Sequence, residues 1–447
     1  MALLAACGSS GTTGGAAPAS KGSSSASPSA SVLAGGASCS SSATKLTFWA
    51  WVPGMSRAVT AFNKSHPSIC VTLENPGAGL DEYTPLSNAL KAGSGAPDVA
   101  EIEFDELPSF IVQKDVVNLV PYGASNYKSD FVPWAWQEVS QGSAVYAMPS
   151  DAGPAGFYYN SKLLAQYHLT PPTTWAQFAT EASTLHKDNA KVYLANFSAT
   201  DLQWLLTAMA QAGAFPYTYS GGSSVGIHWT GSAELKFASY WQQLISSQVI
   251  STVNDANNSP LPNQDLDNGV TASSPLNSAW APSYFQPDAK KTLGDWRAAA
   301  LPQWTPGASV SADWGGSTYP VFKQSAHPAA AAQFSEWLTG SPAAWKILKT
   351  SPSELFPTYK PLLSDASFKS LTYPVSGTSQ PNQVFTAAAG EIQPVQWPPF
   401  MTEALNQALT TFQPVLSGKE TLQKAFQAFQ SQEVSYAKAQ GFSVSTG

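Results

Sequence analysis

The stretch Leu46–Gly54, LTFWAWVPG, begins the first regular pattern of the chain. Side chains of a strand alternate between its two faces, so Trp49 and Trp51 share one face. After the Pro53-Gly54 turn, helix-like and strand-like segments alternate up to about residue 150, which predicts an α/β fold on a parallel sheet. Such sheets bind ligands beyond the carboxyl ends of their strands. We therefore expect Trp49, deeper in the strand, to lie in the core and Trp51 to face a ligand.

The neighbouring elements follow from periodicity and from Gly and Pro punctuation. Strands are predicted over 45–51, 69–77 and 97–104, and helices over 54–67 and 83–95. Further along, Thr174 with Gln177 and Ser417 with Glu420 have the spacing of a helix-capping box. Each box predicts the start of an amphipathic helix.

Length and composition restrict the classes of protein. The chain has 447 residues, too many for one ordinary core, so two or more domains are expected. Charged residues make up 11% and the net charge is −7, with 22 scattered Lys and Arg, so no nucleic-acid surface is indicated. There is no apolar run of about 20 residues that could span a bilayer.

The first 44 residues predict an anchor and a tether. Leu4-Ala5-Ala6-Cys7 resembles a bacterial lipobox, with Cys7 as the lipidated residue. A basic region is missing and the apolar part is short, so we expect the signal to begin upstream of Met1. Residues 8–44 are almost all Gly, Ser, Ala, Thr and Pro, typical of a flexible tether. The protein would then lie at the extracellular face of the cytoplasmic membrane; the alternative is a disordered tail with a chance cysteine.

The two other cysteines are Cys39 and Cys70. An exported protein can oxidise such a pair, so we predict a Cys39–Cys70 disulfide that fixes the end of the tether beside the second strand. Two free thiols are the alternative. No His or acidic residue lies at ligand spacing from either cysteine, so neither a metal site nor a cofactor is expected.

The sequence shows little sign of catalysis. The one G-x-S-x-G match, at 222–226, lies in a Gly/Ser loop and lacks the strand and helix of a nucleophile elbow. Glu101, Glu103 and Asp105 lie along one expected strand, where they cannot flank a glycosidic bond from opposite sides. A carboxylate at a strand end can instead accept hydrogen bonds from sugar hydroxyls. We expect that role for Asp105. For Glu103, a contact with the ligand and a structural bond within the sheet both stay open.

Several segments, in order, resemble the extracellular solute-binding proteins of ABC importers, the group that contains maltose- and oligosaccharide-binding proteins. The most specific is YYNSKLL followed by PPTTWAQF, within 158–178. The others are at 46–51, 58–73, 96–111, 116–123, 146–157, 269–281, 315–345 and 390–409. Many relatives carry a charged group where this chain has VQWPPF, and GVTASSPL lacks the usual Ala-Met. The identity of the ligand therefore stays open.

The resemblance implies a two-lobe, periplasmic-binding-protein-like α/β fold with a hinge, and with the ligand in the cleft between the lobes. After the tether of 1–44, the first lobe would comprise 45–151 and 306–352. The second lobe would comprise 152–305 and 353–447. The lobes would be joined by crossings near 151–157, 301–306 and 352–357.

The resemblance also implies a site and a function. A pyranose has apolar faces that stack on aromatic rings, and hydroxyls that need polar partners. The motif-matched positions that supply them are Trp51, Asp105, Asp151, Tyr158, Asn277, Trp280, Trp314, Gly315, Gly316 and Trp397. Core packing is the alternative for each tryptophan. We expect a monomer that captures a carbohydrate and delivers it to ABC permease subunits without chemistry. The alternatives are a secreted carbohydrate-active enzyme and a binding protein for a non-sugar solute.

Overall fold

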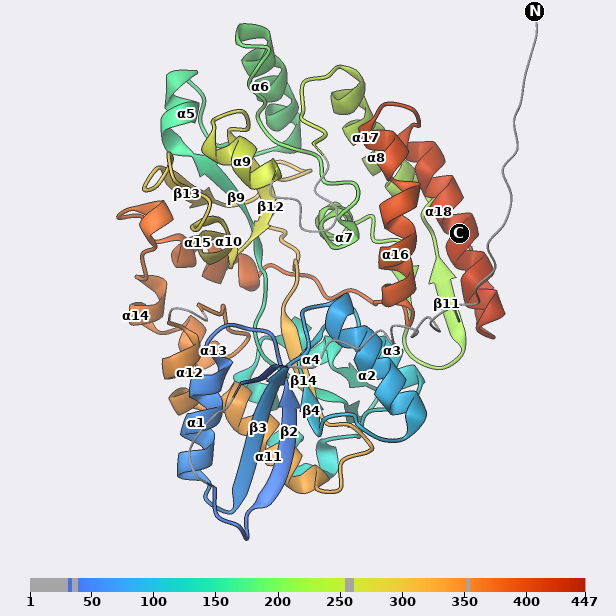
Figure 1. Cartoon of the computed structure of the whole chain (residues 1–447). Coiled ribbons are helices and arrows are strands. Elements are labelled where there is room, and N and C mark those ends of the chain that lie inside the picture. The colour runs from blue at the N-terminus through green and yellow to red at the C-terminus, as the bar shows by residue number, and fades with distance from the viewer. Residues whose placement is uncertain (1–30, 34–38, 254–260, 351–353, 447) are drawn as a thin grey trace, which may run out of the picture.

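The computed structural model describes residues 31–33, 39–253, 261–350 and 354–446. They form two lobes, one above the other in Figure 1, and each lobe is built around a large hydrophobic core. The first core takes its residues mainly from Leu46 to Ala152 and from Tyr319 to Ile392. The second runs from Ala155 to Leu301 and from Phe400 to Ala437. The two-lobe α/β architecture expected from the sequence is confirmed.

Among the described residues, the first lobe contains two larger sheets and the antiparallel pair β6-β7. In the order β1-β3-β2-β4, strand β2 is parallel to both β3 and β4, and β1 is antiparallel to β3. The second sheet, β5-β14-β8, is antiparallel. The elements are β1 (Ser31–Leu33), β2 (Thr44–Trp49), α1 (Met55–Ser65), β3 (Ile69–Asn75), α2 (Leu80–Ala92), β4 (Val99–Ala100), β5 (Ile102–Glu103), α3 (Leu107–Val112), η1 (Val120–Tyr122), η2 (Ala124–Asp130), α4 (Pro133–Glu138), β6 (Ser140–Gln141), β7 (Ala144–Val145), β8 (Ala147–Pro149), β14 (Ser317–Pro320), α11 (Pro328–Gly340), α12 (Pro342–Leu348), α13 (Lys360–Leu363) and α14 (Ala366–Lys369).

The second lobe is richer in helices and is built on the antiparallel sheet β12-β9-β13. Its elements, with α15 beside β9 and β13, are β9 (Ala155–Asn160), α5 (Ser161–Gln166), α6 (Trp175–Asp188), α7 (Leu202–Gln211), β10 (Tyr217–Thr218), β11 (Ser224–Ile227), α8 (Ser232–Ser246), α9 (Leu261–Asp267), β12 (Ser273–Ser278), α10 (Ala281–Phe285), β13 (Trp296–Ala299), η4 (Pro374–Ser376), α15 (Pro381–Ala389), α16 (Met401–Thr411), α17 (Gln413–Leu416), α18 (Leu422–Ala439) and β15 (Ser443–Ser445).

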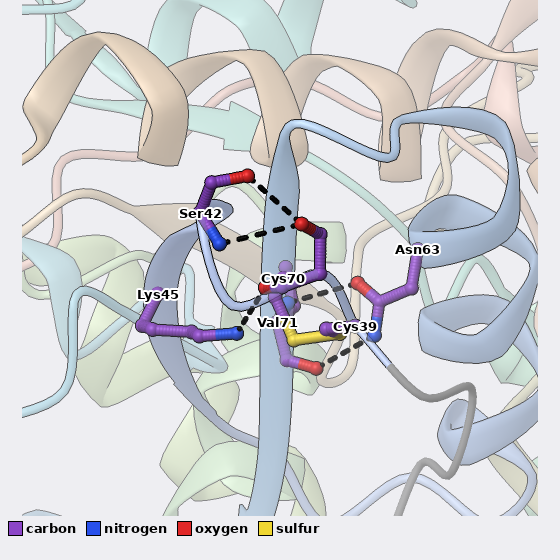
Figure 2. Close-up of a disulfide and its surroundings, with 7 residues drawn as sticks. Cys39, Ser42, Lys45, Asn63, Cys70 and Val71 are labelled. Carbon is purple, nitrogen blue, oxygen red and sulfur yellow. Dashed lines mark hydrogen bonds between the residues drawn. A yellow bond between two sulfur atoms is a disulfide. The ribbon is translucent and has the colours of Figure 1, made fainter.

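Part of the expected tether is folded. β1 lies inside it and pairs with β3, and it contains Val32 and Leu33, the only branched apolar residues between 8 and 44. A disulfide joins Cys39 to Cys70 with the Cα atoms 5.8 Å apart, which is the predicted pairing (Figure 2). The tether prediction is therefore wrong for 31–33 and 39–44, because strand pairing and the disulfide hold them on the sheet. Cys7 lies outside the described residues.

Three segments connect the lobes, and two expected boundaries shift. The first crossing runs from Ser150 to Ala155, close to the prediction. The second lies at 311–317 instead of 301–306, because Trp304 packs in the second core, 4.9 Å from the ring of Tyr240. The third, at 355–358, bonds to the first through Ala152 N and Phe356 O at 2.8 Å. After residue 353, the chain from Leu355 to Phe368 still packs in the first core, and Phe385 and Ala389 of α15 contribute to that core again. Between them, Tyr373 and Val375 pack in a separate small core, and contacts with the second core resume at Phe400.

Candidate ligand-binding site

A cavity of about 570 Å³ lies between the two cores, where the crossing segments meet. Its walls come from both lobes: the turn after β2 and strand β5 on one side, and α7, α9, β12 and α10 on the other. The lining residues are Trp51, Val52, Pro53, Glu101, Glu103, Asp151, Asn196, Ser198, Asp201, Gln203, Trp204, Pro262, Asn263, Leu266, Thr271, Ser273, Ser274, Pro275, Asn277, Trp280, Tyr284, Trp314, Gly315, Gly316, Ser317 and Leu355. A ligand here would contact both lobes at once.

The crossing segments approach each other too closely for larger residues. Trp314 N donates to Gly153 O at 2.9 Å, and a Cβ atom on Gly153 would lie 1.9 Å from the carbonyl oxygen of Trp314. Gly316 has φ +90°, and a Cβ atom there would lie 2.7 Å from the carbonyl oxygen of Asp151. Both glycines are required because backbone lies against backbone at the base of the cavity.

A buried carboxyl group fixes the turn that presents Trp51. The backbone N–H groups of Trp51 and Val52 donate to Glu101 Oε2 at 3.0 and 3.3 Å, and Ser317 Oγ donates to Oε1 at 3.0 Å. Burial, with repulsion from Asp151, raises the pKa of Glu101 to about 8. The chain leaves the first sheet at Glu101 between β4 and β5, so the single strand expected over 97–104 is two short strands.

Two further carboxyl groups face the cavity from its first-lobe side. Tyr83 Oη donates to Glu103 Oε2 at 3.0 Å, and burial with repulsion from Asp105 raises the pKa of Glu103 to about 8. Asp151, on the first crossing, is only 7% exposed, and its Oδ1 atom has no hydrogen-bond partner. Burial raises its pKa to about 6. This side is acidic, and part of its acceptor capacity is unused.

Aromatic rings form much of the opposite side. Trp280 and Trp314 lie with their ring centroids 4.9 Å apart, and Trp280 Nε1 donates to the backbone oxygen of Trp314 at 3.2 Å. The ring of Tyr284 stands edge-on to Trp280 at 5.3 Å. Beside them, Asn277 Nδ2 donates to Ser274 Oγ at 2.9 Å. Flat apolar faces next to amide and hydroxyl groups suit a ligand with apolar faces and a polar edge.

The structure brings seven of the ten predicted site residues to this cavity. They are Trp51, Asp151, Asn277, Trp280, Trp314, Gly315 and Gly316. Trp49 does not line the cavity and lies, as expected, in the first core. It is 8% exposed, and its Nε1 atom donates to Glu74.

The other three lie elsewhere. Asp105 is buried and accepts from Gln203 Nε2 at 2.8 Å, across the two lobes. Tyr158 packs on Trp296 in a separate small core because neighbouring residues of β9 alternate between faces. Trp397 packs against Phe215 and donates to Glu138 at 2.8 Å. None of the three lines the cavity.

Sequence reasoning missed the part of the wall around the start of α7. Asn196, Ser198, Asp201, Gln203 and Trp204 line the cavity. Asp201 caps α7 by accepting from Trp204 N at 2.9 Å, so an N-cap pattern was the one local signal present. Nothing in that pattern indicates that this helix begins at the cleft.

The described residues contain no group of three or more His, Cys, Asp or Glu side chains placed to hold a metal ion. Within the same residues, none of the helices is both long and apolar enough to cross a bilayer.

Comparison with known proteins agrees with this architecture. The model of the family described as bacterial extracellular solute-binding protein matches residues 51–345. A lactose-binding protein of Rhizobium radiobacter is 27% identical over 330 residues, covering 68% of this chain and 73% of that protein.

Two solved structures share the fold. An ABC transporter associated binding protein of B. animalis subsp. lactis Bl-04, in complex with β-1,6-galactobiose, has a TM-score of 0.77 and 28% identity, covering 90% of this chain and 99% of its own. The galacto-N-biose-/lacto-N-biose I-binding protein of Bifidobacterium longum also has a TM-score of 0.77, with 22% identity, covering 91% and 100%. The family model matches well over half of this chain, which therefore belongs to the bacterial extracellular solute-binding proteins.

Proposed function

We propose that this protein captures an oligosaccharide in the cavity between its lobes and presents it to the permease of an ABC importer. The observation that carries the proposal is the lining: Trp51, Trp280 and Trp314 offer apolar faces, and carboxylate, amide and hydroxyl groups surround them. That combination matches the apolar faces and polar edge of a pyranose. The sugar ligands named for the related proteins support the same class.

Binding without chemistry fits the family, whose members bind solutes for transport and are not enzymes. The carboxyl groups at the cavity also fit this role. Glu101 is occupied by two backbone N–H groups and a hydroxyl, and it lies on the same side as Glu103. Asp201, on the opposite side, accepts from the backbone N–H of Trp204 as the cap of α7. Glycosidases need two carboxyl groups on opposite sides of the bond.

The test is a thermal-shift and calorimetric screen of the purified protein against β-1,6-galactobiose, lactose and arabinooligosaccharides, with chromatography of the sugar afterwards. A ligand that binds only the folded state stabilises it by about 2.7 kcal/mol at 100 times its Kd. We expect stabilisation by at least one saccharide, which is recovered intact. Hydrolysed sugar would overturn the proposal, and so would a screen in which only non-sugar solutes bind.

We further propose that the protein is monomeric and anchored through a lipid on Cys7 at the outer face of the membrane. The support is the Leu4–Cys7 pattern ahead of a Ser/Gly/Ala-rich stretch. Expression in a bacterial host behind a complete lipoprotein signal sequence, followed by detergent partitioning, tests the anchor. The wild-type chain should enter the detergent phase and Cys7→Ser should stay in the aqueous phase. Equal partitioning of the two would refute the anchor.

A further inference from the structure

Three carboxyl groups of the first lobe accept hydrogen bonds from the second lobe, beside the cavity. The pairs are Asp105 with Gln203 Nε2 at 2.8 Å, Glu106 with Thr402 Oγ1 at 2.9 Å, and Glu138 with Trp397 Nε1 at 2.8 Å. None of the three carboxyl groups lines the cavity. These contacts therefore depend on how the lobes are placed and not on direct contact with a ligand.

The contact between Glu106 and Thr402 is the simplest of the three. Glu106 directly precedes α3, Thr402 lies in the first turn of α16, and neither residue lines the cavity. By comparison, Gln203 lines the cavity, and Glu138 also accepts from the backbone N–H of Val395. Only the Glu106–Thr402 contact joins the lobes through one hydrogen bond between two side chains that are both away from the ligand.

Glu106 is poorly placed to carry a charge. It is fully buried, its Oε1 atom has no hydrogen-bond partner among the described residues, and Ser109 Oγ lies 3.5 Å from Oε2. Burial, with repulsion from Asp105 and Glu103, raises the pKa of Glu106 well above its ordinary value of 4.5. Lobes in contact therefore favour a protonated Glu106, and separated lobes would return it to water and to its ordinary value.

Building on the proposed capture of a saccharide between the lobes, we propose that Glu106 and Thr402 form a latch that closes with the lobes, strengthens ligand binding without touching the ligand, and takes up a proton. The lobes are joined by crossing segments, about which such proteins open and close. A contact made only in the closed arrangement stabilises it, and a ligand that binds this arrangement gains affinity as its population rises. Glu106 and Thr402 are thus positioning residues.

The groups around the latch act in the same direction. The titratable groups that act on Glu106 and on its neighbour Asp105 belong to the first lobe and the crossings, and they are Tyr83, Glu103, Glu138 and Asp313. Burial raises the pKa of Asp105 to about 6 and that of Glu138 to about 7.

The second-lobe helices packed on the latch also carry acidic groups. Glu403 of α16 accepts from Gln407 on its own helix, and Asp201 caps α7. Closing should therefore take up protons above the ordinary carboxyl pKa, so saccharide affinity should fall as the pH rises from about 5 to about 8.

Titration calorimetry of the full chain with β-1,6-galactobiose, and with lactose, tests the proposal. Neither sugar titrates in this range, so every proton taken up binds to the protein. Measurements in two buffers of different ionisation enthalpy give the number of protons. We expect proton uptake on binding, and an affinity that falls by up to about tenfold per pH unit for each proton.

Two variants separate the parts of the latch. Thr402→Val removes the donor and should weaken binding at about pH 5 by about three- to tenfold. Thr410→Val, an exposed position near the end of the same helix, is its control and should bind like the wild type.

Glu106→Gln keeps an oxygen for Thr402 and is neutral at every pH. It should bind the sugar more tightly than the wild type at about pH 8 and take up fewer protons, which a purely structural role would not change. Asp188→Asn, at an exposed carboxylate of α6, should leave the proton uptake as it is.

The failures are distinguishable. If Thr402→Val binds as tightly as Thr410→Val, the latch is overturned. If the wild type takes up no protons, or if folded Glu106→Gln takes up as many as the wild type, the proton does not belong to Glu106. Saccharide capture stands in each of these cases. If Glu106→Gln does not fold, the wild type and Thr402→Val decide.

If neither sugar binds, the carbohydrate proposal falls and the latch is tested on the ligand-free chain by small-angle X-ray scattering. At about pH 5 the wild type should then have a smaller radius of gyration than Thr402→Val. Equal radii would overturn the latch as well.

Discussion

The tryptophans of this chain differ in what surrounds their rings. Trp345 is 1% exposed, and its Nε1 atom donates to the backbone oxygen of Thr339 inside the first core. Trp280 is only partly buried and faces the cavity. The ring of Trp345 is surrounded by packed side chains, whereas the ring of Trp280 has a side that is open to a ligand.

Replacing Trp280 with alanine should therefore affect ligand binding, and replacing Trp345 should affect stability. Trp280→Ala should weaken saccharide binding by about ten- to a hundredfold, because a stacking face is lost, while the ligand-free melting temperature changes little. Trp345→Ala should reduce the free energy of unfolding by about 3–5 kcal/mol through the cavity it creates. Calorimetry and urea denaturation measure the two quantities. A large loss of stability in Trp280→Ala would place that ring in the core.

Single residues also show how far sequence reasoning reaches at the site. Trp51 could be placed because strand period and strand end are local features. The partner of Asp105 could not, since Gln203 comes from the other lobe, 98 residues away. Tyr158 was misplaced because proximity to a crossing in sequence does not say which face of β9 a ring occupies.

Elements were predictable where their signals are local. Thr174 caps α6 and accepts from Gln177 N at 3.1 Å, as its capping box indicates. The other expected box fails: α18 is capped by Thr421, and Ser417 bonds to the backbone of Pro414. The position of the second crossing, at 311–317, depends on contacts between distant segments, which no local pattern contains. The same holds for Phe400, where the chain resumes its contacts with the second core.

Two crossing segments lie so close together that a single added methyl group on Gly153 should destabilise the protein. Gly153→Ala should destabilise the protein and weaken ligand binding, because its Cβ atom would overlap the carbonyl group of Trp314. Overpacking of this kind costs about 1–3 kcal/mol. Gly390→Ala is the matched control, with φ −78° and its nearest atom at 3.4 Å. Urea denaturation of both variants tests the prediction, and equal stabilities would contradict it.

The disulfide should stabilise the first lobe. Cys39→Ser should lower the free energy of unfolding by about 2–4 kcal/mol, since the bond closes a loop between residues 31 apart in sequence. Urea denaturation with and without reductant measures it. Reductant should bring the wild-type protein to the level of the variant and leave the variant unchanged. A wild-type protein insensitive to full reduction would contradict the prediction.

Across the whole molecule, buried carboxyl groups link stability to pH. Burial raises the pKa of Glu101 and Glu103 at the cavity to about 8. It does the same for Glu433, which accepts from Tyr217 and from Trp229 Nε1 in the second core. The folded chain therefore holds protons that the unfolded chain has released above its ordinary carboxyl pKa of 4.5.

Because the folded chain binds more protons than the unfolded chain, we predict that stability is greatest at mildly acid pH. The free energy of unfolding should fall as the pH rises from about 5 to about 8, since over that range the folded chain keeps protons that the unfolded chain releases. Glu433→Gln, which is neutral at every pH, should reduce the slope. Glu420→Gln changes a half-exposed carboxylate that pairs with Lys424 and should not. Urea denaturation across the range measures it, and stability that increases with pH would contradict it.

The order of attachment at the N-terminal side has a mechanical consequence. Going along the chain, β1 pairs with β3, then Cys39 is bonded to Cys70 in β3, and only then does β2 begin at Thr44. A pull on the chain before Ser31 would first peel β1 from the edge of the sheet. The disulfide would then transmit part of the force to β3, and only the remainder would pass through the short segment that leads into β2. The central strand, whose end carries Trp51 at the cavity, is thereby shielded from tension on the tail.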